Sequence, residues 1–261
     1  MTSSMLPAIW GIVVRDLSRS RRQRSRLIGG LARPFMWLLL VGGGYNAIAR
    51  IDGVSSYQAF VFPGIVVMAM FFGAMLTAIA TVYDREFGML RLMLASPGGV
   101  PAMLVGRAIA AAIVGALQGA VVLLCMPFFV SVTAVQFLAA AGALLVGAIT
   151  SSMLGLLVAA PLRSVENFAG VINVVLFPLL FLSGALYPTA AMPAALRGVA
   201  LANPITYAVD LTRAALGQGA EFTVARSLSV LGVATVLAFT LTLVIFDPEQ
   251  RFVLRRRTGK P

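Results

Sequence analysis

Residues 59–83 read AFVFPGIVVMAMFFGAMLTAIATVY, an apolar run without a single charged side chain. A helix needs about 20 mostly apolar residues to cross the hydrocarbon core of a bilayer, and this run is long enough. Asp84, Arg85 and Glu86 follow at once, which places a boundary between membrane and water at its end. The run therefore predicts a transmembrane helix.

Five more segments have the same character, so we predict an all-α membrane protein with six transmembrane helices. Only 11% of the 261 residues are charged, whereas soluble domains carry about 25%. No stretch is polar enough for a separate soluble domain, and residues 1–261 are expected to form one membrane unit. Arg33, near the start of the first span, is expected to extend towards the lipid headgroups. The predicted spans are Leu27–Ala49, Ala59–Tyr83, Ala108–Val130, Phe137–Ala160, Phe168–Tyr187 and Val224–Phe246.

The basic residues predict the orientation of the chain. With the N-terminus in the cytoplasm, most of the 20 Lys and Arg residues lie inside, and those left outside are Arg50, Arg197, Arg213 and Arg226. Cytoplasmic segments of membrane proteins carry this excess. Both termini, including the tail 247–261, are therefore expected on the cytoplasmic side of a bacterial inner membrane. The basic residues flank apolar runs, which favours anionic lipids over nucleic acid as neighbours.

The basic segment 1–26 contains a helical pattern. Apolar residues recur there at helical spacing, which predicts an amphipathic helix in the cytoplasmic interface, with a frayed terminus as the alternative. The residues of this pattern are Leu6, Ile9, Trp10, Val13 and Leu17.

A short cytoplasmic helix is predicted in the loop 84–99. Asp84 and Glu86 suit a helix N-terminus, and Arg91 suits the later turns. Phe87, Leu90 and Leu94 would share one face, which would dock either on another protein or on the bilayer surface.

On the outer side, residues 188–223 predict two short helices. Pro193 can open the first, and Asn203 with Pro204 gives the second an N-cap followed by proline at its first position. Asp210 and Arg213 are three residues apart and can pair on this helix. The resulting hairpin either dips into the outer leaflet or lies on it.

Several kinds of chemistry are missing from the sequence. It has no histidine and one cysteine, Cys125, so thiol-built metal sites and histidine-based catalysis are not expected. The predicted spans contain no acid at mid-depth, which disfavours proton- or sodium-coupled transport. No glycine-rich phosphate loop ends in Lys-Ser or Lys-Thr. We expect neither an enzyme nor a bound cofactor.

Two stretches carry a family resemblance. The first is Asp84-Arg85-Glu86-Phe87-Gly88 with Leu94-Ala95-Ser96-Pro97, and the second runs from Glu166-Asn167-Phe168 through Leu182–Pro188 and Asn203–Tyr207 to Asp210–Arg213. Together they resemble the permease subunits of type-2 ATP-binding-cassette exporters, nearest to the daunorubicin-resistance and nodulation-factor export branch.

The resemblance implies that two permeases pair and that each rests on a cytoplasmic ATPase, which binds ATP and Mg. The N-terminal helix and the loop 84–99 would contact that ATPase, and the outer hairpin would cap the export path. The coupling residues would be Asp84, Arg85, Glu86, Phe87, Gly88, Leu90, Arg91 and Leu94, and the hairpin residues Pro193, Asn203, Pro204, Tyr207, Asp210 and Arg213.

The substrate is expected to be an amphipathic or lipophilic small molecule. Lipid-linked glycan or polysaccharide export is the alternative, followed by a passive pore or membrane scaffold. Candidates for lining the path are Asn167, Asn173, Phe177, Phe181 and Ser183, although each phenylalanine could equally pack against protein or lipid.

Overall fold

The computed structural model describes residues 5–46, 56–90, 98–129 and 131–246. All regular structure within these ranges is helical, which confirms the all-α class. Five helices are long and apolar enough to cross a membrane. The first is Leu27–Tyr45, which comprises most of α2 (Arg24–Met36), the π-helical segment η1 (Trp37–Gly42) and most of α3 (Gly43–Asn46). The third is α6 (Gly99–Leu124), which η2 (Met126–Phe128) continues. The second, fourth and fifth are α4 (Tyr57–Glu86), α7 (Ala134–Ala159) and α12 (Val224–Ile245).

The predicted fifth span differs from the structure. Residues 165–181 form a shorter apolar helix, made of α8 (Val165–Val171), the π-helical segment η3 (Ile172–Leu176) and α9 (Phe177–Phe181). Ser164 caps its start by accepting a hydrogen bond from the Asn167 N–H. Its end is followed by a turn in which Gly184 has φ +76°, a conformation that continues no helix. The helix therefore stops before Tyr187, and the part of the chain that the structure describes has five long spans where the sequence predicted six.

The central element of the bundle is α4, which is almost entirely buried between α2, α6, α7 and α11 (Pro204–Ala215). Small residues let its neighbours approach closely. A Cβ on Gly115 of α6 would lie 2.7 Å from the carbonyl oxygen of Met70, and one on Gly155 of α7 would lie 3.0 Å from Cβ of Ala78. Both glycines therefore serve packing within the bundle.

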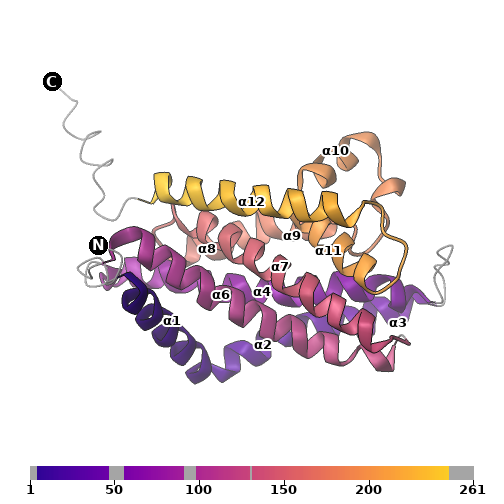
Figure 1. Cartoon of the computed structure of the whole chain (residues 1–261), viewed down its shortest axis with the longest axis horizontal. Coiled ribbons are helices and arrows are strands. Elements are labelled where there is room, and N and C mark those ends of the chain that lie inside the picture. The colour runs from indigo at the N-terminus through magenta and orange to yellow at the C-terminus, as the bar shows by residue number, and fades with distance from the viewer. Residues whose placement is uncertain (1–4, 47–55, 91–97, 130, 247–261) are drawn as a thin grey trace.

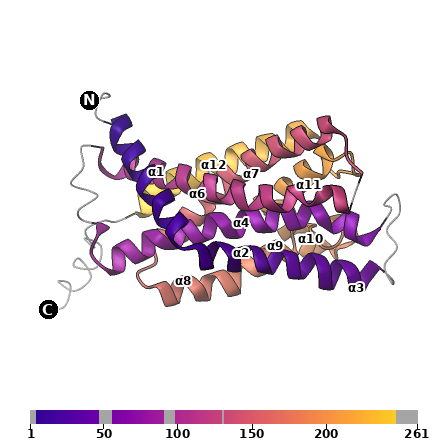
Figure 2. The same cartoon turned by 90° about the horizontal axis from the view of Figure 1, so that it is seen from below.

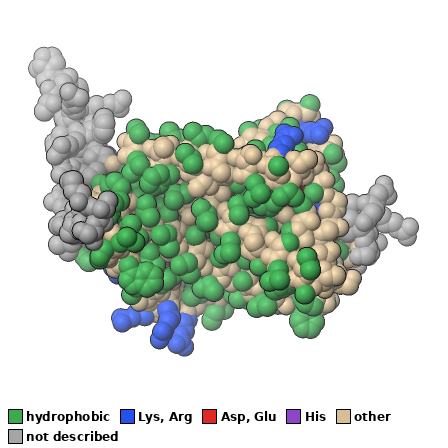
Figure 3. Space-filling view, in the orientation of Figure 1, with side chains coloured by type: hydrophobic (Ala, Val, Ile, Leu, Met, Phe, Trp, Pro, Cys, Tyr) green, Lys and Arg blue, Asp and Glu red, His purple; other side chains and the backbone are tan. Residues whose placement is uncertain are grey.

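The two ends of the bundle are formed by different elements. Figure 1 shows that α1 (Met5–Arg22) and the end of α12 lie at one end, whereas α3 and α11 lie towards the other. We call these the α1 end and the hairpin end. Hydrophobic side chains cover most of the face seen in Figure 3, and Lys and Arg gather near the α1–α2 junction and near α10 (Ala194–Ala202).

α6 begins at Gly99, earlier than the predicted span at Ala108. Arg107, assigned by sequence to a cytoplasmic segment, consequently lies inside a long apolar helix and is 1% exposed. An arginine buried so deeply requires an acidic partner, which the last turn of α4 supplies.

Candidate functional site

Asp84 lies in the last turn of α4, where it receives three arginines. Its carboxylate accepts hydrogen bonds from Arg15 at 2.8 Å and Arg19 at 2.9 Å, both on α1, and from Arg107 of α6. Arg107 also donates to the Thr81 hydroxyl at 3.0 Å. One carboxylate therefore joins α1, α4 and α6, and the Asp84 side chain is only 7% exposed.

The next two residues contact other elements. Arg85 donates to the carbonyl oxygens of Ala160 and Leu162, at 2.6 and 2.8 Å, and its guanidinium lies 4.9 Å from the Phe246 ring centroid. Glu86 accepts a hydrogen bond from the Val165 N–H at 3.1 Å, at the N-terminus of α8. A carboxylate is favourable there because the helix dipole is positive at that end. Asp84, Arg85 and Glu86, which we call the α4 clamp, thus hold α1 and α6, the end of α7, and the start of α8.

The prediction that a separate helix begins at Asp84 was wrong. Asp84 and Glu86 belong to the last turn of α4, and Gly88, with φ +74°, ends the helical path. Acids are unfavourable at a helix C-terminus, but the arginines and the α8 N–H groups offset that cost. Local sequence rules could not reveal these partners because they come from residues up to 79 positions away.

The residues predicted to share one apolar face of this loop do not have the same environment. Phe87 is 71% exposed, and its ring stacks on Tyr83 at 6.2 Å. Leu90 is instead 3% exposed and packs in a cluster with Ile12, Met103 and Phe246. Arg91 and Leu94 lie outside the described residues.

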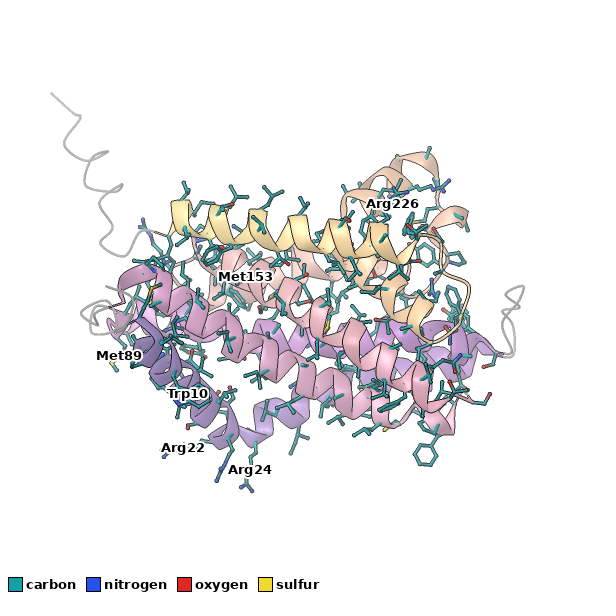
Figure 4. All side chains as sticks on the ribbon, viewed as in Figure 1. Trp10, Arg22, Arg24, Met89, Met153 and Arg226 are labelled. Atoms are coloured by element: carbon teal, nitrogen blue, oxygen red, sulfur yellow. The ribbon has the colours of Figure 1, made fainter. Side chains whose placement is uncertain are left out.

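The amphipathic helix predicted near the N-terminus is present as α1. Its buried face consists of Ile12, Val13 and Asp16. Leu6 and Trp10, predicted on the same apolar face as Val13, are 74% and 67% exposed. Figure 4 shows Trp10 and Met89 at the α1 end, where Met89 follows Phe87 and Gly88 in the turn after α4. α1 therefore presents one side to α6 and leaves a second apolar side uncovered.

The two short helices predicted for residues 188–223 form close to the predicted bounds, as α10 and α11 (Pro204–Ala215). Pro193 precedes α10, and Asn203 caps α11 by accepting from the Ile205 N–H at 3.1 Å. The Asn203 amide also donates to the Leu179 carbonyl at 2.7 Å, and Tyr207 donates to the Leu201 carbonyl at 2.9 Å. Every residue from Ile205 to Arg213 is buried. α11 thus packs against α4, α7 and α12.

Asp210 and Arg213 do not form the predicted ion pair among the described contacts. Asp210 accepts from the N–H groups of Glu221 and Phe222 and from the Ser227 hydroxyl. Burial raises the pKa of the Asp210 carboxyl although these hydrogen bonds lower it. Arg213 donates to the Gly184 carbonyl at 3.0 Å and lies 4.3 Å from the Phe60 ring centroid. Each side chain ties α11 to a different segment.

The five path candidates have different environments. Asn167 and Asn173 are exposed, and Phe177 and Phe181 are half-buried. Phe177 lies 5.5 Å from Phe72 between ring centroids, and Phe181 meets Trp37 edge-on at 5.4 Å. Ser183 is 1% exposed and donates its hydroxyl to the Leu180 carbonyl, so it is not available to line a path here.

Sequence reasoning missed several residues of these sites. They are the arginine partners of Asp84, the acid Glu221, which binds Thr189, and the rings of Phe72 and Phe177, against which the Arg33 guanidinium lies. The available signal was an arginine within an apolar run, which in membrane helices marks a buried partner or a pathway.

Comparisons with known proteins agree over most of the chain. The family model described as "ABC-2 type transporter" matches residues 7–216. Similar proteins include ycf38 of Cyanophora paradoxa, named a transport permease, at 30% identity over 77% of this chain and 71% of that protein. Nodulation protein J of Rhizobium leguminosarum bv. viciae is 28% identical over 84% of this chain and 85% of its own. YbhR of Escherichia coli, named a multidrug ABC transporter permease, is 29% identical over 74% of this chain and 51% of its own.

Proposed function

The chain belongs to the ABC-2 type transporter family, and we propose that it is the membrane-spanning subunit of an ATP-driven exporter. A separate ATP-binding-cassette ATPase would bind ATP and Mg and hydrolyse the nucleotide. The cargo would be an amphipathic or lipophilic small molecule leaving across a bacterial inner membrane. This chain would be a transport subunit and not an enzyme.

The α4 clamp is the observation that carries the proposal. Work supplied by a separate ATPase must enter the membrane subunit through a contact. At the α1 end, one turn of the central helix is tied by Asp84, Arg85 and Glu86 to α1, α6, α7 and α8. A displacement of that turn would therefore reach most of the bundle at once.

The surface beside the clamp supplies an anchor for the partner. Phe87 and Met89 follow the clamp and are 71% and 47% exposed, and Trp10 of α1 is 67% exposed. Exposed aromatic and methionine side chains are typical anchors of protein interfaces. We propose that Phe87 fills a groove on the ATPase. Leu90 has an internal packing role instead, because it is buried.

The orientation and assembly follow from the same proposal. The α1 end would face the cytoplasm, because the arginine-rich segment around Arg22 and Arg24 lies towards it, as Figure 4 illustrates. Two permease copies would pair, each on its own ATPase, with membrane lipids around them. The hairpin of α10 and α11 would close the outer end of the path.

The test is a comparison of two exposed phenylalanines at opposite ends. Phe87 is 71% exposed at the α1 end, and Phe128 is 85% exposed in η2. The chain is co-expressed with the ATP-binding-cassette ATPase that the proposal expects to be encoded beside it. We expect Phe87→Ala to reduce co-purification and coupled ATP hydrolysis, because burying a phenylalanine contributes about 1.5–3 kcal/mol, and Phe128→Ala to change neither. Full transport with no ATPase bound would establish a passive pore instead.

A further inference from the structure

Arg33 occupies an unusual position for a charged residue in a membrane span. Its guanidinium carbon lies 5.0 Å from the Phe72 ring centroid and 5.3 Å from that of Phe177. Phe72 lies roughly 18 Å from Asp84 along α4 at 1.5 Å of rise per residue, which exceeds half of the ~30 Å hydrocarbon thickness. With Asp84 at the membrane boundary, as the sequence predicts, the two rings would hold the charge of Arg33 near mid-depth and away from the headgroups.

The Arg33 side chain is exposed and has no oxygen partner among the described residues. Its recorded contacts are the two ring faces, which attract a cation but accept no conventional hydrogen bond. A guanidinium has five N–H donors. An arginine that faced only lipid at this depth would be strongly unfavourable, and charged residues inside spans mark substrate or ion pathways.

A second copy of the chain brings no counter-ion to this depth. The sequence has 9 acidic residues, and those in the described part lie in α1, in the α4 clamp, near the start of α8, or around the hairpin. The remaining ones lie outside the described residues, between or beyond the apolar runs. The full set is Asp16, Asp52, Asp84, Glu86, Glu166, Asp210, Glu221, Asp247 and Glu249.

The surroundings of Arg33 have an irregular backbone on both sides. The π-helical segment η1 begins at Trp37, one turn after Arg33, and the π-helical segment η3 ends directly before Phe177. The two helices lie side by side in Figure 2 and touch through Trp37 and Phe181. π-helical turns are rare in proteins as a whole, and those that occur are often found at functional sites. This flank therefore combines a cation, aromatic faces and the exposed amide of Asn173.

We infer that Arg33, held between Phe72 and Phe177, binds the oxyanion of an amphipathic anion, in which a carboxylate, sulfate or phosphate is joined to an apolar body. The guanidinium fork matches such oxyanions, and the phenylalanine faces suit the apolar body. A transported molecule is favoured over a resident lipid because lipid headgroups lie about 15 Å away, at the edge of the hydrocarbon. The inference rests on the proposed function, since it names the class of cargo.

Binding can be measured without the ATPase by using Trp37 as the reporter. The chain has two tryptophans, so Trp10→Phe leaves Trp37, four residues after Arg33, as the sole emitter. The purified chain is placed in phosphatidylcholine nanodiscs and titrated with stearic acid that carries a nitroxide quencher near its carboxyl group. The methyl ester of the same molecule has no charge and reports quenching by simple partition into the bilayer.

We expect Arg33→Gln to raise the half-quenching concentration of the acid on the order of tenfold, the equivalent of one charge-assisted hydrogen bond, and to leave the ester unchanged. Arg33→Lys keeps the charge and should raise the half-quenching concentration of the acid by a smaller factor. Arg226→Gln is the matched control, because Arg226 is also exposed and lies 4.7 Å from a phenylalanine ring, that of Phe222, but at the hairpin end.

Two results would overturn the inference. One is quenching by the acid that Arg33→Gln does not alter in a variant whose gel-filtration profile is unchanged. The other is equal, Arg33-dependent quenching by phosphatidylglycerol carrying the same nitroxide, which would assign Arg33 to lipid headgroups. Failure of the proposed function is distinguishable, since it would abolish ATPase coupling and leave Arg33-dependent quenching in place.

Discussion

The Asp84 carboxylate and the Arg107 guanidinium are joined by a hydrogen-bonded ion pair that links the last turn of α4 to α6. The Arg107 side chain is 1% exposed and that of Asp84 is 7% exposed, so water screens this pair poorly. Arg15 and Arg19 approach the same carboxylate from α1, where their side chains are 38% and 34% exposed. The pair is therefore the buried core of a cluster with a solvated rim.

Asp84→Asn should destabilise the bundle by about 3–5 kcal/mol, because it leaves Arg107 buried without a counter-charge. Unfolding in mixed micelles of detergent and SDS measures this loss. Arg19→Gln is the control, since a partly exposed partner contributes less than about 1 kcal/mol. The double variant Asp84→Leu with Arg107→Met should be milder than Asp84→Asn alone, and equal or greater damage in the double variant would contradict the ion-pair account.

The topology predicts which sites an external reagent cannot reach. Single cysteines at Ser18, Gly98 and Arg257, in a Cys125→Ala background, should resist an impermeant thiol reagent added to intact cells and react after lysis. The basis is the distribution of Lys and Arg, which favours the α1 end inside. Ready labelling of any of the three in intact cells would reverse or break the proposed orientation.

Asn203→Ala should weaken export and leave assembly with the ATPase intact. The variant loses the cap of α11, which contributes about 1 kcal/mol, and also the tie from the Asn203 amide to the Leu179 carbonyl. Thr223→Ala is the matched control, because Thr223 caps α12 through the Arg226 N–H and makes no recorded contact with α9. Loss of ATPase binding in Asn203→Ala would place the hairpin at the wrong end of the molecule.

The sequence predicted the features of this chain that depend on neighbours in the sequence. Long apolar runs predicted α4, α7 and α12, and the Asn203-Pro204 pair predicted the start of α11. These features follow from local hydrophobicity and capping, which a single chain segment determines.

The errors arose where distant residues decide the outcome. The dipole rule placed a helix start at Asp84, but arginines of α1 and α6 allow that acid to sit at the end of α4. The spacing of Asp210 and Arg213 suggested a local pair, but each side chain finds a partner from another segment. For Arg33, nothing in the sequence indicated the aromatic rings of α4 and α9 that lie against its guanidinium.

Glu86 and Phe87 are adjacent at the end of α4 but have different roles: Glu86 binds α8, and Phe87 is proposed to bind the ATPase. Its carboxylate accepts a hydrogen bond from the Val165 N–H, which ties α4 to α8 and so to the segment that carries Phe177 beside Arg33. Phe87, the next residue, is exposed and free to meet a partner.

Glu86→Ala should therefore leave co-purification with the ATPase intact and lower substrate-stimulated ATP hydrolysis on the order of tenfold, as expected for one charge-assisted hydrogen bond. Glu166→Ala is the control, because Glu166 is exposed like Glu86 and lies in the first turn of α8, but has no recorded hydrogen bond to α4 among the described residues. If Glu86→Ala abolished co-purification as Phe87→Ala should, Glu86 would belong to the docking surface, and the motion of α4 would have to reach the Arg33 flank by another route.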